Sequence, residues 1–512
     1  MTADLNESLR LFRLIIPAFP EVNVFTRMAK KTTALGPVMV ATCANKVWGW
    51  RAEVIDENNY RGPRNVQGLP DHEVLQRENP AQAVGFYTGL SSTIERVWEL
   101  AGLYKRMKVP TIAGGWHAHY LPEETLSHNV DIVVHGDGEE AIAQILPVLL
   151  NKELLSLVGG ISFIQDQKMT TTYFKENKVS DIGLLPYPDF NLVRYARIKV
   201  YPISRIRGCS RNCEFCSVKG EPRFSTSRHL FNIVQWLNDT RRAKNFFIVD
   251  DRLEEDLKGT LEFFEMISKE YGDSFNFQVQ IRLEAAENNR LLEAMKKAGV
   301  RFVSIGAESP IDEDLKSMRK GYLSSKMVEW VAMIKRYFWV HLMFIAGYPL
   351  KGKKCELSPK EIVKRFKKFI RRARPNSIQV LLPGPGAGTD LRKRLEAQAR
   401  IFPQDIVPWR YYDGNYVCFI PDGMTTRELQ GIPAKIMRWF YWRPFRLLHF
   451  LFRTFIIFPI DFFLRGKELS VKSLIREKLC YEAYGLIKKW IERFRKSDFM
   501  GKLEEYQQKK LS

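Results

Sequence analysis

The stretch Cys209-Ser-Arg-Asn-Cys213-Glu-Phe-Cys216 places three cysteines within eight residues. Three thiolates on one short loop can ligate three irons of a four-iron cluster and leave the fourth iron without a protein ligand. An open iron can bind a small molecule and pass it an electron, which indicates reactive chemistry rather than a scaffold. The loop therefore predicts an iron–sulfur site with Cys209, Cys213 and Cys216 as its ligands.

Two other uses of these cysteines fit the sequence less well. A structural zinc site needs four ligands, and the nearest other candidate, His229, falls inside a predicted helix. A disulfide would pair two thiols, leave the third alone and require an oxidising compartment. The remaining cysteines are scattered singly, and the total of 7 is odd. The chain also starts without a basic segment that leads into an apolar run. We therefore expect a cytoplasmic protein with a cluster.

The charge of the chain is strongly basic, with 79 Lys and Arg against 58 Asp and Glu and a net charge of +21. Basic residues are dense over 351–374 and recur over 435–446. This balance suits nucleic acid or an anionic membrane surface, and a solvated face is the alternative. No RNA-binding module is recognisable, and the aromatic residues cluster with apolar runs. We therefore expect no nucleic-acid partner and keep an RNA-binding or RNA-modifying protein as the alternative of another class.

Residues 1–180 predict a Rossmann-like domain, because apolar strand-like runs alternate with helical patterns. Helices are expected over 92–107 and 139–150, and a hairpin over 159–173 closes the domain. The predicted strands cover residues 11–16, 52–55, 84–87, 110–113 and 131–134. Glycine-rich loops follow three of these strands, at residues 88–92, 114–119 and 136–139. Ligands bind beyond the carboxyl ends of such strands, so the loops together predict a pocket.

Residues 200–400 predict a second α/β domain, after a proline-containing linker at 181–199. Its strands are expected at 202–206, 246–250, 275–281, 302–305, 341–345 and 377–382. Six βα units make a partial (β/α)6 barrel, and the cysteine loop follows the first strand at the active end of such folds. Polar residues also end several strands, where they either touch a cofactor or only cap a helix. They are Asp250, Asp251, Gln280, Arg282 and Glu308.

Residues 401–512 predict a mostly helical region that contacts the substrate or a membrane surface. Residues 439–464 are aromatic and apolar, but Arg443, Arg446 and Arg453 interrupt them. Arginine at mid-membrane is costly, so we expect no membrane-spanning helix. An interfacial helix that lies on a membrane and a helix that packs its apolar side on the barrel both remain open.

Over about residues 10–400 the chain resembles the cobalamin-binding radical S-adenosylmethionine proteins, and the cysteine spacing is the most specific part of this resemblance. The other landmarks are Gly114-Gly-Trp-His117, Pro122-Glu-Glu124, Val134-His-Gly136-Asp-Gly-Glu139, Arg207-Gly-Cys209, Val249-Asp-Asp251, Gly306-Ala-Glu308-Ser309 and Pro383-Gly-Pro-Gly386. The chain lacks the Asp-x-His-x-x-Gly motif of better-known cobalamin proteins, because none of its eight histidines has Asp two residues earlier. The resemblance therefore implies a cobalt without a protein histidine below it.

This resemblance also implies roles for individual residues. The three cysteines would ligate a 4Fe-4S cluster whose open iron binds S-adenosylmethionine. The residues implied to contact S-adenosylmethionine are Phe215, Gln280, Arg282, Gly306 and Glu308. The residues implied to line a cobalamin pocket are Ser91, Ser92, Gly114, Gly115, His117 and Gly136.

The implied activity is transfer of a methyl group to an unactivated carbon, after a 5′-deoxyadenosyl radical has removed hydrogen. The amphipathic C-terminal region favours a hydrophobic, lipid or isoprenoid-like small molecule, as in the hopanoid methylases of this family. A reducing electron donor is the expected partner, and the inner membrane surface is an expected peripheral contact. The alternatives are a radical cyclase like the anaerobic magnesium-protoporphyrin ester cyclase and a non-catalytic iron–sulfur scaffold.

Overall fold

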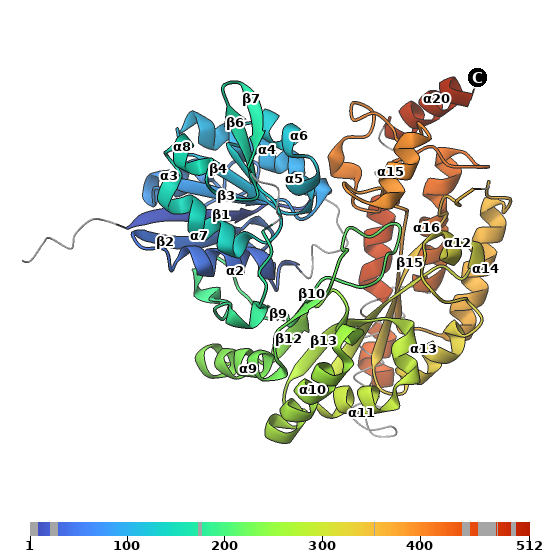
Figure 1. The fold of residues 1–512 in the computed structure, drawn as a ribbon. Helices are drawn as coiled ribbons and strands as arrows, with labels where there is room; N and C mark the ends of the chain where they lie inside the picture. The colour runs from blue at the N-terminus through green and yellow to red at the C-terminus, as the bar shows by residue number, and fades with distance from the viewer. Residues whose placement is uncertain are drawn as a thin grey trace, which may run out of the picture.

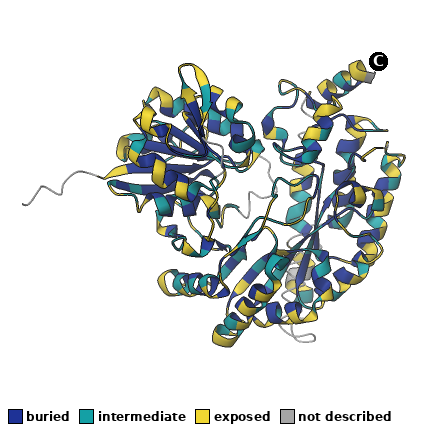
Figure 2. Cartoon of the chain, viewed as in Figure 1, coloured by how far each residue is buried: buried dark blue, intermediate teal, exposed yellow. Residues whose placement is uncertain are grey.

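Two α/β lobes and a helical C-terminal region make up the chain (Figure 1). The computed structural model describes residues 9–20, 29–172, 177–352, 354–442, 451–458, 478, 480–492 and 498–511. Buried residues concentrate in the strands of both lobes (Figure 2), so each lobe has its own core. The predicted α/β class with two parallel sheets is confirmed.

The N-terminal lobe is built on an eight-stranded sheet in the order β7-β6-β5-β4-β3-β1-β2-β8. Its strands are β1 (Arg10–Ile16), β2 (Trp50–Asp56), β3 (Ala83–Tyr87), β4 (Thr111–Gly114), β5 (Ile132–Val134), β6 (Ile161–Gln165), β7 (Lys168–Thr171) and β8 (Val193–Arg194). The first five and β8 run parallel, whereas β6 and β7 form the predicted antiparallel hairpin. β1 reads Arg-Leu-Phe-Arg-Leu-Ile-Ile and is buried after its first residue, as expected for a strand covered on both faces.

Helices and short 3₁₀ turns connect these strands. They are α2 (Leu35–Ala44), η1 (Glu57–Asn59), α3 (His72–Glu78), η2 (Ser91–Thr93), α4 (Ile94–Arg106), α5 (Trp116–Tyr120), α6 (Pro122–Ser127), α7 (Gly138–Val148), α8 (Lys152–Leu155), η3 (Ile182–Leu184) and η4 (Phe190–Leu192). The segment predicted as a linker at 181–199 includes η3, η4 and β8. Because β8 pairs with β2, this segment extends the N-terminal sheet.

The second lobe is a partial barrel of six parallel strands in the order β16-β15-β14-β13-β12-β9. Its strands are β9 (Tyr201–Ile203), β12 (Asn245–Ile248), β13 (Asn276–Ile281), β14 (Val300–Glu308), β15 (Trp339–Ile345) and β16 (Ser377–Leu381). The connecting elements are α9 (Ser227–Arg241), η5 (Leu253–Asp256), α10 (Leu257–Tyr271), η6 (Leu283–Glu287), α11 (Asn289–Lys297), α12 (Asp312–Ser317), α13 (Met327–Lys335), α14 (Pro359–Ala373) and α15 (Asp390–Ala397). Figure 1 shows α10, α11, α13 and α14 along the outside of this sheet.

The first barrel strand is shorter than the sequence predicts. β9 ends at Ile203, and the chain then enters a separate antiparallel pair, β10 (Ile206–Arg207) and β11 (Arg223–Phe224). The physical reason is Asp250, whose Oδ1 accepts hydrogen bonds from the backbone N–H groups of Arg205 (2.7 Å) and Ile206 (2.9 Å). These donors are therefore lost to the sheet, and β10–β11 brackets the cysteine loop instead.

The C-terminal region packs on the edge of the barrel. It contains η7 (Trp409–Tyr411), α16 (Thr426–Tyr441), the π-helical turn η8 (Arg453–Ile457) and α20 (Phe499–Leu511). Tyr441 caps the edge strand β16, since its hydroxyl accepts from the Ile378 N–H (2.9 Å) and donates to the Ile378 carbonyl (2.6 Å). Most of the amphipathic stretch 439–464 lies outside the described residues. None of the described helices is long and apolar enough to cross a membrane.

Candidate active site

The cysteine loop lies between β10 and β11, beyond the carboxyl end of β9. Cys213 is buried, whereas Cys209 and Cys216 are half-buried. Burial raises the pKa of the Cys216 thiol to about 11, and the nearby Cys213 and Cys209 add to the rise. The three thiols are thus close enough to influence one another. A donor set of three such thiols on one loop fits an iron–sulfur cluster, whose irons stabilise thiolates.

Acidic side chains from the segment after β12 and from η5 hold the first half of this loop. Asp251 Oδ2 accepts the N–H of Gly208 at 2.7 Å, and Glu255 Oε1 accepts the N–H of Ser210 at 2.7 Å. Gly208 has a φ of +90°, which favours glycine. Asp251, which the sequence places at this strand end, and Glu255 of η5, which the sequence does not single out, therefore orient the loop backbone around Cys209.

Charged residues lie together at the ends of β13 and β14, and Arg282 among them is close enough to Cys213 to interact with it electrostatically. Burial lowers the pKa of Arg282, but Glu284, Tyr322 and Cys213 outweigh this effect and raise it. The Arg282 guanidinium donates to Glu284 Oε1 at 2.7 Å and to the Lys320 carbonyl. Arg282 therefore lies near the loop, as an S-adenosylmethionine contact would require, and its assigned role stays a prediction.

Glu308 and Gly306 lie on β14, at an irregularity in its pairing with β15. Glu308 has a φ of +60°, and its Oε1 forms an ion pair with Lys320 Nζ at 3.0 Å. The Gly306 carbonyl accepts from the Tyr322 hydroxyl at 3.0 Å. The sequence does not single out Lys320, because nothing in the stretch Met318-Arg-Lys-Gly-Tyr322 indicates that this lysine is buried. Gln280 is exposed at the end of β13, and its predicted contact with a cofactor stays untested.

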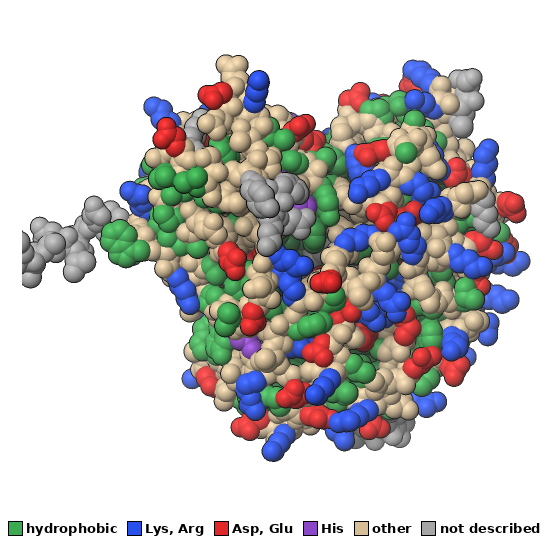
Figure 3. Space-filling model, in the orientation of Figure 1, with side chains coloured by type: hydrophobic (Ala, Val, Ile, Leu, Met, Phe, Trp, Pro, Cys, Tyr) green, Lys and Arg blue, Asp and Glu red, His purple; other side chains and the backbone are tan. Residues whose placement is uncertain are grey.

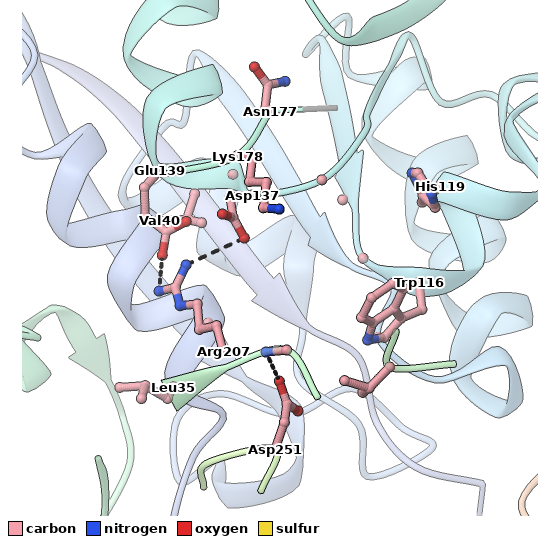
Figure 4. A pocket seen from close by; sticks show the side chains of 18 of the residues that line it. Leu35, Val40, Trp116, His119, Asp137, Glu139, Asn177, Lys178, Arg207 and Asp251 are labelled. Carbon is pink, nitrogen blue, oxygen red and sulfur yellow. Dashed lines mark hydrogen bonds and ion pairs between the residues drawn. The ribbon is translucent and has the colours of Figure 1, made fainter. Parts of the chain in front are cut away.

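A cavity of about 470 Å³ lies between the two lobes (Figure 4). The N-terminal lobe contributes Gly114, Gly115, Trp116, His119, Gly136 and Glu139, among others. The barrel lobe contributes Arg207, Gly208, Val218, Arg223, Val249 and Asp251, among others. A mixed apolar and polar lining at the carboxyl edge of a parallel sheet suits a large cofactor. The cavity therefore fits a cofactor that both lobes contact.

Three of the residues predicted for the cobalamin pocket line this cavity: Gly114, Gly115 and Gly136. A Cβ on Gly136 (φ +82°) would lie 2.2 Å from the Asn177 carbonyl oxygen, and one on Gly115 (φ +131°) would lie 2.6 Å from the Thr88 backbone. These two glycines are therefore needed for close packing between loops of the protein.

His117 and Ser91, both predicted for the cobalamin pocket, are not among the residues that line the cavity. The His117 ring is buried, with Nδ1 3.1 Å from Ser91 Oγ and Nε2 3.2 Å from Glu124 Oε2. Ser92 is also buried in η2 and is absent from the lining. Trp116 and His119 line the cavity instead, because residues three apart share one face of α5 and His117 points elsewhere. Helical spacing in Gly-Gly-Trp-His-Ala-His-Tyr is the signal that distinguishes the two histidines.

Ion pairs join the two lobes beside the cysteine loop. Figure 4 shows the Arg207 guanidinium between the carboxylates of Glu139 and Asp137. The Arg207–Glu139 contact is 2.5 Å and the Arg207–Asp137 contact is 3.5 Å. Arg223 also pairs with Asp137. Because Arg207 is two residues from Cys209, the start of the cysteine loop forms part of the cavity wall.

The segment after the barrel returns to the N-terminal lobe. Trp409 Nε1 donates to Glu124 Oε1 at 2.8 Å, and its ring lies edge-on to His117 with 4.9 Å between centroids. Arg410 pairs with Glu95 at 2.6 Å. The two lobes are therefore linked at a second place, and Figure 3 shows the notch that remains between them, with many Lys and Arg side chains on the barrel side.

Comparison with known families assigns each lobe. The model of the radical SAM superfamily matches residues 203–354, and the model of the B12 binding domain matches residues 23–146. An uncharacterized methyltransferase of Synechocystis is 21% identical over 321 residues, which are 61% of this chain and 55% of that protein. The anaerobic magnesium-protoporphyrin IX monomethyl ester cyclase of the same organism is 22% identical over 365 residues, 67% of this chain and 70% of that protein.

A solved structure shares the fold over nearly the whole chain. It is the radical S-adenosylmethionine methyltransferase TsrM from Kitasatospora setae with cobalamin and a [4Fe-4S] cluster bound, with a TM-score of 0.65 and 14% identity. The likeness covers 96% of this chain and 100% of that one. The chain thus contains a radical SAM domain that follows a B12-binding domain.

Proposed function

We propose that the chain is a cobalamin-dependent radical S-adenosylmethionine methyltransferase that acts on an unactivated carbon of a hydrophobic small molecule. One observation carries this proposal: the cysteine loop and the glycine loops of the B12-binding domain border the same cavity. Gly208, next to Cys209, lines it together with Gly115 and Gly136. Two cofactors bound at these loops would meet across one space, as transfer between them requires.

The residues divide into two groups around that space. Cys209, Cys213 and Cys216 would hold the cluster, and the charged group at Arg282 and Glu308 would hold S-adenosylmethionine. The cavity residues of the N-terminal lobe would hold cobalamin. When bound, these groups supply a hydrogen-abstracting radical and a methyl group. The protein positions them and excludes water, and the Trp409–Glu124 contact supports this by keeping the lobes together.

Exposed apolar residues near the C-terminal end support a hydrophobic substrate and a peripheral membrane contact. Trp442, Phe452 and Phe455 are 57%, 53% and 70% exposed. Basic side chains also cover the outer face of α14, which suits an anionic surface. Sedimentation with vesicles of phosphatidylglycerol and with vesicles of phosphatidylcholine tests this contact. Binding to the anionic vesicles that weakens with salt is expected, and no binding to either would contradict it.

Anaerobic reconstitution with iron, sulfide and hydroxocobalamin tests the proposed cofactors. We expect about four irons and one cobalamin per chain, and an EPR spectrum of the reduced cluster that changes when S-adenosylmethionine is added. Cys213→Ala should lose most of the iron, whereas Cys355→Ala, a control outside the loop, should keep it. A cluster that forms without cobalamin would contradict the cobalamin-dependent methyltransferase.

A radical cyclase is the second candidate, because the cyclase relative is aligned over 70% of its own length. The two activities differ in the fate of a methyl label. With S-adenosylmethionine labelled in its methyl group, a methyltransferase places the label in the product, whereas a cyclase does not. Unlabelled product that has lost hydrogen would favour the cyclase.

A further inference from the structure

Glu214 is a buried charged residue inside the cysteine loop, between Cys213 and Phe215. Its side chain is 1% exposed and accepts three hydrogen bonds. Arg394 of α15 donates from Nε to Oε1 at 2.8 Å and from Nη2 to Oε2 at 2.9 Å, which makes the pair bidentate. The Tyr348 hydroxyl donates to Oε2 at 2.7 Å. Both carboxylate oxygens therefore accept from donors outside the loop.

The backbone of Glu214 is held by α15 and by the residue that follows α12. The Glu214 carbonyl accepts the N–H of Leu391 at 3.0 Å, and the Glu214 N–H donates to the Met318 carbonyl at 3.1 Å. Asp390 pairs with Lys219 at 3.2 Å, and Lys219 Nζ donates to the Cys213 carbonyl at 3.1 Å. The first turn of α15 therefore holds Glu214 directly through Leu391, and it holds the Cys213 carbonyl indirectly through Asp390 and Lys219.

Arg394 is itself fixed by the turn after β15. Its Nη1 and Nη2 donate to the carbonyls of Leu350 and Pro349 at 3.3 and 2.9 Å. Tyr348, next in the chain, also packs edge-on against Phe215, with ring centroids 6.5 Å apart. One arginine thus connects the cysteine loop, the turn after β15 and α15. α15 lies outside residues 203–354, which the radical SAM model matches.

Two opposite charges held in this way affect a neighbouring cluster in two separable ways. They fix the position of the loop, and each charge alone would shift the potential of the cluster, because net charge and hydrogen bonds near an iron–sulfur cluster set its reduction potential. In the intact pair the two charges largely cancel. A positive charge left alone would stabilise the reduced, more negative cluster, and a negative charge left alone would destabilise it.

We propose that Glu214, Arg394 and Tyr348 are positioning residues of the iron–sulfur loop, and that pairing of Glu214 with Arg394 prevents the shift in the reduction potential of the cluster that either charge alone would cause. This inference rests on the proposed role of the three cysteines as cluster ligands. A pair that served only to stabilise the fold would lower iron retention in any variant but would not shift the potential in opposite directions.

The test is a redox titration of the reconstituted full chain, followed by EPR of the reduced cluster. Glu214→Gln is expected to raise the potential, Arg394→Gln to lower it, and the double variant to return toward the wild-type value. Shifts in the same direction, or no shift in either variant, would overturn the proposal. If wild-type protein takes up no iron, the proposed cluster ligands fail instead, so the two failures are distinguishable.

Two further variants keep the test independent of folding. Arg394→Lys keeps the charge but loses the bidentate geometry, so it should keep a near-wild-type potential while losing iron faster on exposure to a chelator. A shift as large as that of Arg394→Gln would contradict the charge argument. Arg427 of α16 and Glu504 of α20 form a similar bidentate pair far from the loop in sequence. Nε donates to Oε1 at 2.8 Å and Nη2 to Oε2 at 2.7 Å, and the Arg427 side chain is 64% exposed. Arg427→Gln should leave both the potential and the iron content unchanged.

Discussion

The two lobes position their cavity-facing loops by opposite means. In the N-terminal lobe, Gly115 and Gly136 allow loops to pack backbone against backbone, because any side chain there would collide. In the barrel lobe, the cysteine loop is held by charged side chains such as Asp251, Glu255 and Arg394. A loop of metal ligands must keep its thiols directed at one point. Hydrogen bonds to charged side chains can do this, because they fix the orientation of the groups that they join. A loop that borders a large cofactor needs mainly a smooth, closely packed wall.

The largest effect on stability is expected when a single methyl group is added to one of these closely packed glycines. Gly136→Ala puts a Cβ 2.2 Å from the Asn177 oxygen at a residue with a φ of +82°. Strain and overpacking together should lower the free energy of unfolding by about 3–4 kcal/mol. Urea unfolding followed by tryptophan fluorescence measures it.

Gly114→Ala is the matched control, because its Cβ would meet only Val134 at 3.8 Å. It should leave the unfolding free energy unchanged or slightly higher. Equal losses in the two variants would show that close backbone packing is not what these glycines provide.

The ionic side of the comparison is tested by Arg207→Gln. The Glu139 side chain is 4% exposed and would lose its charged partner from the other lobe. Removing one member of a buried pair is costly, and because Arg207 is 24% exposed we expect a loss of about 2–3 kcal/mol in unfolding free energy. In Arg301→Gln, a control at an exposed pair with Asp273, the change should stay within about 0.5 kcal/mol. Similar small changes in both would argue against a structural contact between the lobes.

Both lobes also hold a histidine whose charged form is disfavoured, buried His135 in the N-terminal lobe and half-buried His341 in the barrel, which makes the lobes alike in their response to acid. Burial lowers the pKa of His341 in the barrel and of His135 in the N-terminal lobe to about 4. The folded state therefore binds a proton less readily than the unfolded state, whose histidine titrates near pH 6.5. This contribution to stability is present above pH 6.5 and is lost as the pH falls toward 4.

For His341, we expect the free energy of unfolding to fall by about 2 kcal/mol between pH 7 and pH 5. His341→Gln should remove this part of the pH dependence, as shown by urea unfolding at both pH values. His135→Gln provides the corresponding measurement in the other lobe. An unchanged slope in the His341 variant would mean that the folded state protonates this histidine as readily as the unfolded state does.

The sequence was most informative where function depends on neighbouring residues. The cysteine loop, the six barrel strands and the N-terminal alternation all follow from local patterns, and the structure agrees with them. Glu214 and Lys320 could not be found in this way. Their partners Arg394 and Glu308 are 180 and 12 residues away, and only the fold brings them together. The resemblance points to His117, whereas His119 lines the cavity, because the two histidines point in different directions on helix α5.

The smallest effect is expected at the second contact between the lobes. Trp409→Phe keeps an aromatic ring against His117 but removes the hydrogen bond from Nε1 to Glu124. One such bond contributes about 1 kcal/mol, so a small fall in the midpoint of thermal unfolding is expected. The matched control is Trp98→Phe, since Trp98 Nε1 has no hydrogen-bond partner in the described part of the chain and its ring stacks on His128. That substitution removes no hydrogen bond and should cost less. If Trp98→Phe destabilised the protein as much as Trp409→Phe, ring size rather than the bond to Glu124 would account for both, and the contact would hold the lobes together by packing alone.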